Sequence, residues 1–249
     1  MSLKIIVTMA GMGSRITRAG IAQPKYKVMA RGKSLFEWSM LSLRDFFDEE
    51  FIFITRKEIY DEAFLRDRCA ELGIQSYHVV MLEQLTNGQA TTALMADPYL
   101  RGDDSCIIYN IDTYVAEGQI SKVDIWPELD GFIPVTRVQG DHWSFVKTDD
   151  AGTVVDVAEK KPISDLATIG LYYFKSWNQY KKVYHENAEN IPKENKEYYI
   201  APMYKAFIDG NLKVGIKIIP LSDVVFLGTP KEIEAFDPGY VKANMEIRK

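Results

Sequence analysis

The stretch LKIIVTMAGMGSR, residues 3–15, carries the strongest structural signal in the chain. Its first part, Leu3 to Met9, is an apolar run of the kind that forms a buried β-strand. The turn behind it contains Gly11 and Gly13, and glycines let backbone N–H groups approach an anion closely. We therefore expect a strand that ends in a cradle for a phosphate group.

Two basic side chains follow this turn. Arg15 can hold a phosphate through two parallel hydrogen bonds, and Lys25, next to Pro24, adds a compact positive charge. The turn is not a dinucleotide fingerprint, because Ile16 stands where a third glycine is needed, and it lacks the Gly-Lys-Ser/Thr ending of a P-loop. A lone Gly-x-Gly can also be a simple tight turn. Together with the two cations, the first 25 residues favour a nucleotide-handling enzyme.

Composition narrows the class of protein. The chain has 249 residues, of which 47% are hydrophobic, enough to bury a large core. Its net charge of −5 argues against a nucleic-acid partner. Cys69 and Cys106 lie far apart without a metal-ligand pattern, which favours buried free thiols in a reducing compartment. No targeting segment and no apolar run of membrane-spanning length is present, so we expect a cytoplasmic protein without a membrane partner.

The first half of the chain alternates strand and helix signals. The expected strands are 51–55, 77–82 and 105–109; the expected helices are 34–47, 57–72 and 89–96. The first helix begins with a capping box, Ser34 and Glu37, and the second ends at Gly73. This alternation predicts an α/β, Rossmann-like fold with a mostly parallel central sheet and helices on both faces. Ligands bind at the carboxyl ends of such strands.

The second half reads differently. The expected strands are 131–137, 143–148, 153–159, 168–174 and 213–219; the expected helices are 176–185, 199–208 and 230–236, with an irregular piece through Lys196. Short strands joined by turns favour a smaller antiparallel addition. No linker or repeat divides the chain. We expect one domain over 1–249, with a nucleotide-binding half of about 1–130 and an acceptor-binding half of about 131–249.

Six pieces of sequence, taken in order, resemble one enzyme family. They are Gly11 to Arg15, Pro24-Lys25, Gln84 to Ala90, Asp112, Val157 to Pro162, and Gly228-Thr229-Pro230. This order resembles the sugar-phosphate nucleotidyltransferases, or nucleoside-diphosphate-sugar pyrophosphorylases, in their short form with a catalytic domain only. The resemblance spans nearly the whole chain and implies a sheet related to the GT-A glycosyltransferases. It also implies that a phosphorylated small-molecule acceptor attacks the α-phosphorus of an NTP and releases pyrophosphate.

The resemblance implies a role for each motif residue. Arg15 would grip the β- and γ-phosphates, Lys25 would bind the α-phosphate, and Lys160 would neutralise the acceptor phosphate. Asp112 would hold Mg²⁺, which prefers carboxylate and phosphate oxygens. The remaining assignments are nucleotide binding by Ala10, Gly11, Gly13, Ser14, Gln84, Gly88, Gln89 and Ala90, and acceptor binding by Glu159 and Gly170.

Each assignment has a plainer alternative. Asp112 could cap the next segment, Lys25 could be a surface lysine, and Glu159 to Lys161 could be a solvated charge run. Aromatic residues such as Tyr198, Tyr199 and Phe145 are expected in the core, with Trp143 near the acceptor.

The segment Gln84 to Ala90 also bears on the base. In the resembled family, a Gln followed by a Gly and then a small residue lines the base pocket of the thymidylyl and uridylyl enzymes; Gln84, Gly88 and Ala90 match that spacing. A Gln amide both donates and accepts, so it can pair with a pyrimidine edge. We expect UTP, dTTP or CTP rather than GTP or ATP.

Two departures from the family pattern leave alternatives open. Phe226 stands where the family carries its second metal ligand, and the nearest carboxylate is Asp223. The acceptor motif is replaced by Glu197 to Pro202, so the acceptor is either an unusual sugar phosphate or a non-sugar phosphate such as phosphocholine. Two rival functions remain. One is a GT-A glycosyltransferase, but those enzymes usually carry Asp-x-Asp as metal ligands and Asn110-Ile111-Asp112 keeps only one of the two carboxylates. The other is a nucleotide-binding relative without turnover. The sequence does not predict the oligomeric state.

Overall fold

The computed structural model describes residues 2–125, 127–191 and 197–246. Its centre is the parallel strand set built on β1 (Leu3–Thr8), which pairs with β4 (Glu50–Arg56) on one edge and β6 (Ser105–Asn110) on the other. Strand β5 (Ser76–Leu82) continues the parallel set beyond β4. The expected strands are confirmed; β1, β4 and β6 are largely buried because both faces of the sheet are covered there, whereas the edge strand β5 is partly exposed.

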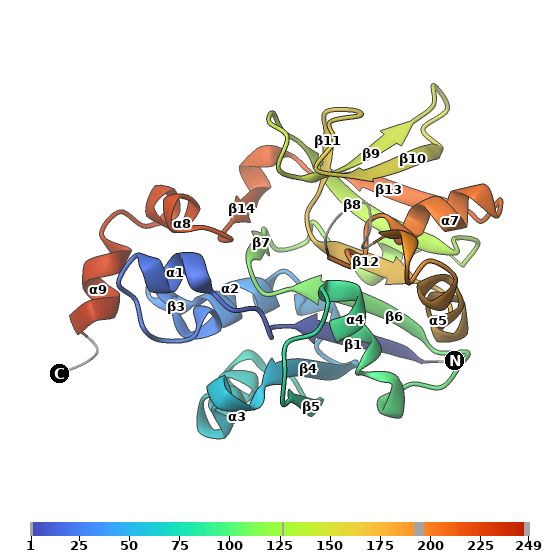
Figure 1. The fold of residues 1–249 in the computed structure, drawn as a ribbon. Coiled ribbons are helices and arrows are strands. Elements are labelled where there is room, and N and C mark those ends of the chain that lie inside the picture. The colour runs from blue at the N-terminus through green and yellow to red at the C-terminus, as the bar shows by residue number, and fades with distance from the viewer. Residues whose placement is uncertain (1, 126, 192–196, 247–249) are drawn as a thin grey trace.

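Successive residues of β1 face opposite sides of the sheet. Ile6 belongs to the core under α4 (Gln89–Leu94), α5 (Trp177–Glu186) and α7 (Met203–Asp209). Its neighbours Ile5 and Val7 belong to the core under α2 (Leu35–Leu41) and α3 (Glu62–Leu72). Helices therefore cover both faces, as the βα alternation predicted (Figure 1).

Local capping sets several helix ends. Ser34 and Glu37 form the expected capping box, but α2 ends at Leu41 and a 3₁₀ turn over Arg44–Phe46 follows, so the helix is shorter than predicted. Helix α3 starts at Glu62, because Asp61 caps it, and stops at Gly73, whose φ of 85° is left-handed. The helix expected over 57–72 is thus confirmed from Glu62 onward, and its first part is a 3₁₀ turn over Lys57–Ile59.

The second half extends the same sheet. Its strands are β8 (Gly131–Arg137), β9 (Ser144–Thr148), β10 (Val154–Glu159), β11 (Leu166–Thr168), β12 (Leu171–Phe174) and β13 (Val214–Ile218). The sheet order is β10-β9-β11-β8-β12-β6-β1-β4-β5. Strand β13 lies outside this order and pairs parallel with β8. Strand β12 pairs antiparallel with β6, so one sheet joins the parallel part to the predicted antiparallel addition.

One expected strand, 168–174, is interrupted. Ile169 and Gly170 separate β11 from β12, and Gly170 has a φ of 82° that favours glycine. On one side of this break β12 pairs with β6, and on the other side β11 pairs with β9. The break therefore lies where β9 replaces β6 as the neighbouring strand.

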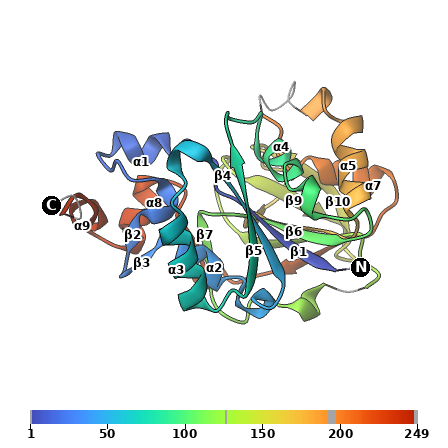
Figure 2. The ribbon, with the colours of Figure 1, turned by 90° about the horizontal axis from the view of Figure 1, so that it is seen from below.

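Short strands and helices, among which the sequence predicted only the helix over 230–236, close one end of the molecule. Strand β7 (Thr113–Val115) pairs with β14 (Val224–Phe226), and β2 (Met29–Ala30) pairs with β3 (Lys33–Ser34). Helices α8 (Pro230–Phe236) and α9 (Tyr240–Glu246) lie beside α1 (Ser14–Arg18) in both views (Figures 1 and 2). Ile16, Ile233 and Tyr240 share one small core there. Helix α7 begins only at Met203 rather than Tyr199, and the last part of the expected irregular piece, 192–196, lies outside the described residues.

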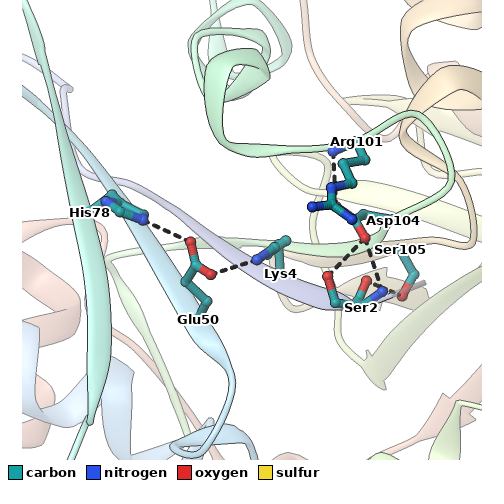
Figure 3. Close-up of polar contacts among 7 residues, drawn as sticks. All are labelled: Ser2, Lys4, Glu50, His78, Arg101, Asp104 and Ser105. Carbon is teal, nitrogen blue, oxygen red and sulfur yellow. Dashed lines mark hydrogen bonds and ion pairs between the residues drawn. The ribbon is translucent and has the colours of Figure 1, made fainter.

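Polar contacts tie together the amino ends of the parallel strands, away from their carboxyl ends (Figure 3). Glu50 accepts from Lys4 at 2.5 Å and lies 2.8 Å from the His78 Nε2. Asp104 accepts from the backbone N–H and hydroxyl of Ser2. These residues fix the strand ends and leave the opposite end of the sheet for a ligand.

Candidate active site

A cleft of about 770 Å³ opens at the carboxyl ends of β1 and β6. Its walls come from both halves of the chain, from the turn after β1 to Thr229 and Glu232 near the start of α8. The structure brings most of the sequence-predicted site residues together here: Ala10, Gly11, Gly13, Ser14, Arg15, Lys25, Gly88, Gln89, Asp112, Glu159, Lys160 and Gly170.

The turn after β1 is held open toward this cleft. Gly13 has a φ of 60°, and its carbonyl accepts the N–H groups of Ile16 and Thr17, which begins α1. From the neighbouring strand β4, the Arg56 guanidinium donates to the Ala10 carbonyl oxygen at 3.1 Å. The side chain of Arg15 is exposed on the cleft wall. Such a turn leaves backbone N–H groups and one guanidinium facing the space where phosphates would bind.

Lys25 and Asp112 meet inside the cleft. The Lys25 Nζ lies 2.6 Å from the Asp112 Oδ2 and also donates to the Gly228 carbonyl at 3.2 Å. Asp112 is fixed through its backbone, because its carbonyl accepts the N–H of Leu227 at 2.8 Å. This ion pair joins three of the sequence motifs, which lie far apart along the chain.

Phe226 occupies the position where the family pattern has a second metal ligand. It is the last residue of β14, lies opposite Thr113, and its ring packs 4.1 Å from that of Trp143. Asp223 does not replace the missing carboxylate at the cleft; it accepts from the Gln119 amide at 2.7 Å and is not among the cleft-lining residues. Phe226 thus places an aromatic ring, and no carboxylate, at this position of the cleft wall.

The residues present fit a divalent cation held by the Asp112 carboxylate, with the Glu232 carboxylate next to it. Within the described ranges, no group of three His, Cys, Asp or Glu residues is placed to hold a metal ion. The Asp112 carboxylate and the Gly228 carbonyl do converge on one positive charge, the Lys25 ammonium. Both are hard oxygen donors, and Mg²⁺ is commonly bound by one or two carboxylates with phosphates and water as its other ligands.

Lys160 and Glu159 form the other charged part of the cleft. The Lys160 Nζ lies 2.6 Å from the Tyr199 hydroxyl, 3.4 Å from the Glu159 carboxylate and 4.4 Å from the centre of the Tyr199 ring. The Glu159 side chain is only 5% exposed and accepts a hydrogen bond from the Ser144 hydroxyl. Glu159 therefore does not belong to a solvated charge run, whereas the Lys160 side chain is 53% exposed and Lys161 is exposed as well.

The balance of forces on Lys160 keeps it positive. Burial acts to lower its pKa, but the hydrogen bond with Tyr199 and the negative charge of Glu159 outweigh that effect, so the pKa of Lys160 is raised. Nearby, burial raises the pKa of Tyr172 to about 12, so its hydroxyl stays protonated and can donate. This part of the cleft therefore contains one cation and one neutral hydroxyl.

Gly88 lies where the segment after β5 meets the segment around Tyr198. A Cβ on Gly88 would lie 2.6 Å from the Tyr198 backbone nitrogen, and its φ of 110° already excludes most residues. Tyr198 donates its N–H to the Asn87 carbonyl and accepts the Ala90 N–H at 2.9 Å. The glycine is needed because two chain segments pass in contact.

Two predicted nucleotide-binding residues lie outside the cleft. Ala90 is fully buried, and both its backbone groups are used, the N–H by Tyr198 and the carbonyl by the Tyr180 hydroxyl. Gln84 is exposed in an adjoining hollow of about 600 Å³. Met12 and Leu85 are exposed apolar side chains that line both spaces.

Sequence reasoning missed several cleft residues. Trp143 and Tyr199 both line the cleft, although the sequence placed Tyr199 in the core. Tyr198 and Phe145 are buried, as predicted. Asn110 packs against Gly170, where a Cβ would lie 2.0 Å from the Asn110 Nδ2. The position of Asn110 at a strand end was a usable signal, because ligands collect there; Tyr199 and Met12 carried none.

Comparisons with known proteins match this architecture. The chain is similar to the crystal structure of a nucleoside-diphosphate-sugar pyrophosphorylase from Vibrio cholerae, with a TM-score of 0.84 and 36% identity over 93% of this chain and 98% of that chain. An inositol-1-phosphate CTP transferase from T. maritima has the same fold, with a TM-score of 0.73 and 14% identity over 99% of this chain and 96% of that one. A provisionally named glucose-1-phosphate thymidylyltransferase from Bacillus anthracis also shares it, with a TM-score of 0.73 and 17% identity over 100% and 96%.

A more distant similarity is seen among curated proteins. The chain is 25% identical over 176 residues, 68% of its length, to a provisionally named mannose-1-phosphate guanyltransferase of Sulfolobus acidocaldarius. The match covers 48% of that relative, so the chain aligns with about half of its length. No protein-family model matches the chain. None of the helices in the described ranges is long and apolar enough to cross a bilayer.

Proposed function

Because the chain belongs to the nucleoside-diphosphate-sugar pyrophosphorylases, also called sugar-phosphate nucleotidyltransferases, we propose that it transfers a nucleotidyl group from an NTP to a phosphorylated acceptor and releases pyrophosphate. One observation carries the proposal. The glycine turn, the Lys25–Asp112 pair and the Lys160–Glu159 pair line a single cleft. A cleft with cations in both halves suits two phosphate-bearing substrates that react with each other.

The nucleotide half would position the triphosphate. Backbone N–H groups of the turn from Ala10 to Ser14 bind its oxygens, and Arg15 grips the β- and γ-phosphates. Lys25 reaches the α-phosphate and stabilises the charge that develops there. The nucleophile is the acceptor's own phosphate, so positioning and charge neutralisation supply the catalysis.

The acceptor half would hold the second phosphate. Lys160 neutralises it, and Glu159 accepts hydrogen bonds from hydroxyl groups of the acceptor. Gly170 leaves room at the break between β11 and β12, where a side chain would collide with Asn110. A sugar 1-phosphate or a similar phosphate fits these groups. The nucleotide half is then residues 1–130 and the acceptor half 131–249.

Asp112 and the Gly228 carbonyl would hold Mg²⁺. When bound, the ion neutralises phosphate charge and aligns the triphosphate. The chain's own contribution is to keep these two oxygens fixed at the end of β6 and after β14.

The base would be a pyrimidine, bound toward Gln84, Gly88 and Gln89. The exposed apolar side chains of Met12 and Leu85 lie between the cleft and the hollow that holds Gln84, and apolar groups of this kind can cover the faces of a base. Solved structures with this fold include a CTP transferase and a thymidylyltransferase. The curated relative is named for guanyl transfer, so the purine nucleotides belong in the test.

A cytoplasmic location is part of the proposal. Cys69 and Cys106 are both free and buried, as expected of thiols in a reducing compartment. Burial raises the pKa of Cys69 to about 12, so this thiol is not a reactive nucleophile.

The test is a pyrophosphate-release screen of UTP, dTTP, CTP, GTP and ATP against sugar 1-phosphates and phosphocholine. Release that requires both substrates supports nucleotidyl transfer. A glycosyltransferase would instead consume a finished nucleotide sugar, and a non-catalytic relative would bind nucleotide without releasing pyrophosphate.

A further inference from the structure

The position beside Asp112 already contains a cation. The Lys25 ammonium lies 2.6 Å from the Asp112 Oδ2 and 3.2 Å from the Gly228 carbonyl oxygen. The Lys25 side chain is 16% exposed and that of Asp112 is 30% exposed, so the pair is only partly screened by water. One charge of each sign is balanced here in the nucleotide-free protein.

A second carboxylate lies next to this pair. The Glu232 Oε2 and the Asp112 Oδ2 both lie within 3.5 Å of the point where a Cβ on Gly228 would stand. Glu232 is held in place because its carboxylate accepts the N–H of Thr229 at 2.7 Å in the capping box of α8. Glu232 also lines the cleft. If Lys25 moved to a phosphate, Asp112 and Glu232 would remain as two negative charges side by side.

From these contacts, and resting on the function proposed above, we propose that Lys25 fills the divalent-cation position of the free enzyme. Lys25 and the metal ion then compete for Asp112, and the Gly228 carbonyl and Glu232 complete the cation position. Bound nucleotide phosphates draw Lys25 away from Asp112 and open the position. The free enzyme therefore binds divalent ions weakly and the nucleotide complex binds them well.

The charges explain the direction of this coupling. A dication at Asp112 would be repelled by the ammonium that lies 2.6 Å from the carboxylate oxygen, because like charges at short range repel, so the two cations weaken each other's binding. A triphosphate offers Lys25 another anionic partner of higher charge. Lys25 thus serves the proposed reaction twice, first as a stand-in cation and then as a ligand of the phosphate.

The experiment measures Mn²⁺ binding to the free protein by electron paramagnetic resonance, with no nucleotide or acceptor present. Wild type should bind Mn²⁺ weakly. Lys25→Met, which removes the competing charge, should bind it at least tenfold more tightly, and Lys25→Gln should behave likewise. Adding Asp112→Asn to Lys25→Met should abolish the gain, and adding Glu232→Gln should reduce it, while the glutamine can still accept from Thr229.

The matched control is Lys27→Met. Lys27 lies in the same 3₁₀ turn and is ion-paired with Asp61 outside the cleft, so its loss should leave Mn²⁺ affinity unchanged. Circular dichroism and thermal melting confirm that each variant is folded. If both Lys25 variants are folded and bind Mn²⁺ no more tightly than wild type, the proposal is wrong. An unchanged affinity on adding Glu232→Gln would remove Glu232 from the site.

This outcome is separable from that of the proposed function. The Mn²⁺ titration needs no turnover, so it can fail while pyrophosphate release succeeds, and it can succeed in a protein that transfers nothing.

Discussion

Replacing Gly88 by Ala should destabilise the protein far more than the same change at an ordinary turn glycine. At Gly88, φ is 110° and ψ is 176°, a backbone conformation that residues other than glycine rarely adopt. Holding alanine in it should cost about 1–3 kcal/mol. The new Cβ would also lie 2.6 Å from the Tyr198 nitrogen, which forces the two chain segments apart.

The second cost comes from two backbone hydrogen bonds. Tyr198 exchanges one with Asn87 and one with Ala90, and each contributes about 0.5–1.5 kcal/mol. Gly88→Ala should therefore lower the free energy of unfolding by about 3 kcal/mol or more. Because this junction connects the nucleotide half to Tyr199, the KM values for both substrates should rise in the folded fraction.

The assay is urea denaturation followed by circular dichroism, with Gly73→Ala as the control. Gly73 is a left-handed helix cap with φ of 85° and ψ of 21°, and a Cβ there would meet nothing within 4 Å. Its substitution should cost only about 1–2 kcal/mol. Equal losses for the two variants, or a Gly88→Ala protein as stable as wild type, would refute the steric reasoning.

Four further outcomes are expected. Lys25→Ala should lower kcat by ~10²-fold while nucleotide still binds, because a cation on the reacting phosphate acts mainly in the transition state; an unchanged rate in stopped assays of pyrophosphate release removes Lys25 from the mechanism. Asp112→Asn and excess EDTA should each abolish turnover without unfolding the protein, and full activity in EDTA would exclude a metal role. Calorimetric titration should show UTP, dTTP or CTP binding several-fold tighter than GTP or ATP, with Gln84→Ala eroding the preference; tightest binding of a purine would overturn the base assignment. The hydrogen bond from Lys4 lowers the pKa of Glu50 below its usual 4.5, so ionised Glu50 stabilises the fold above pH 4.5 and loses this contribution as the pH falls through its lowered pKa. The difference in unfolding free energy between wild type and Glu50→Gln should therefore shrink in acid, and a difference that widens there would contradict the ion pair.

Local sequence signals were sufficient where structure is made by neighbours in the chain. The capping box at Ser34 and the apolar runs of β1, β4 and β6 depend on residues a few positions apart, and the structure contains each of them. The glycine turn also follows from local chemistry. The sequence therefore sufficed to predict the α/β class, the glycine turn after the first strand and the general position of the cleft.

Long-range contacts decided the rest. The β7–β14 pair joins residues 113–115 to 224–226, and neither three-residue strand has a periodicity to detect. The break at Gly170 lies where the neighbouring strand changes from β6, which pairs with β12, to β9, which pairs with β11. This change is visible only in the assembled sheet.

The candidate site shows the same division. Its residue types could be identified from the motifs because glycine turns, arginine and lysine commonly bind phosphate groups and aspartate commonly binds Mg²⁺. What only the tertiary structure decided is which groups meet: Lys25 with Asp112 and the Gly228 carbonyl, Lys160 with Tyr199, and Phe226 with Trp143. The physical reason is that ion pairs and ring contacts act over a few ångströms in space, whereas these partners are separated by 39 to 203 positions along the chain.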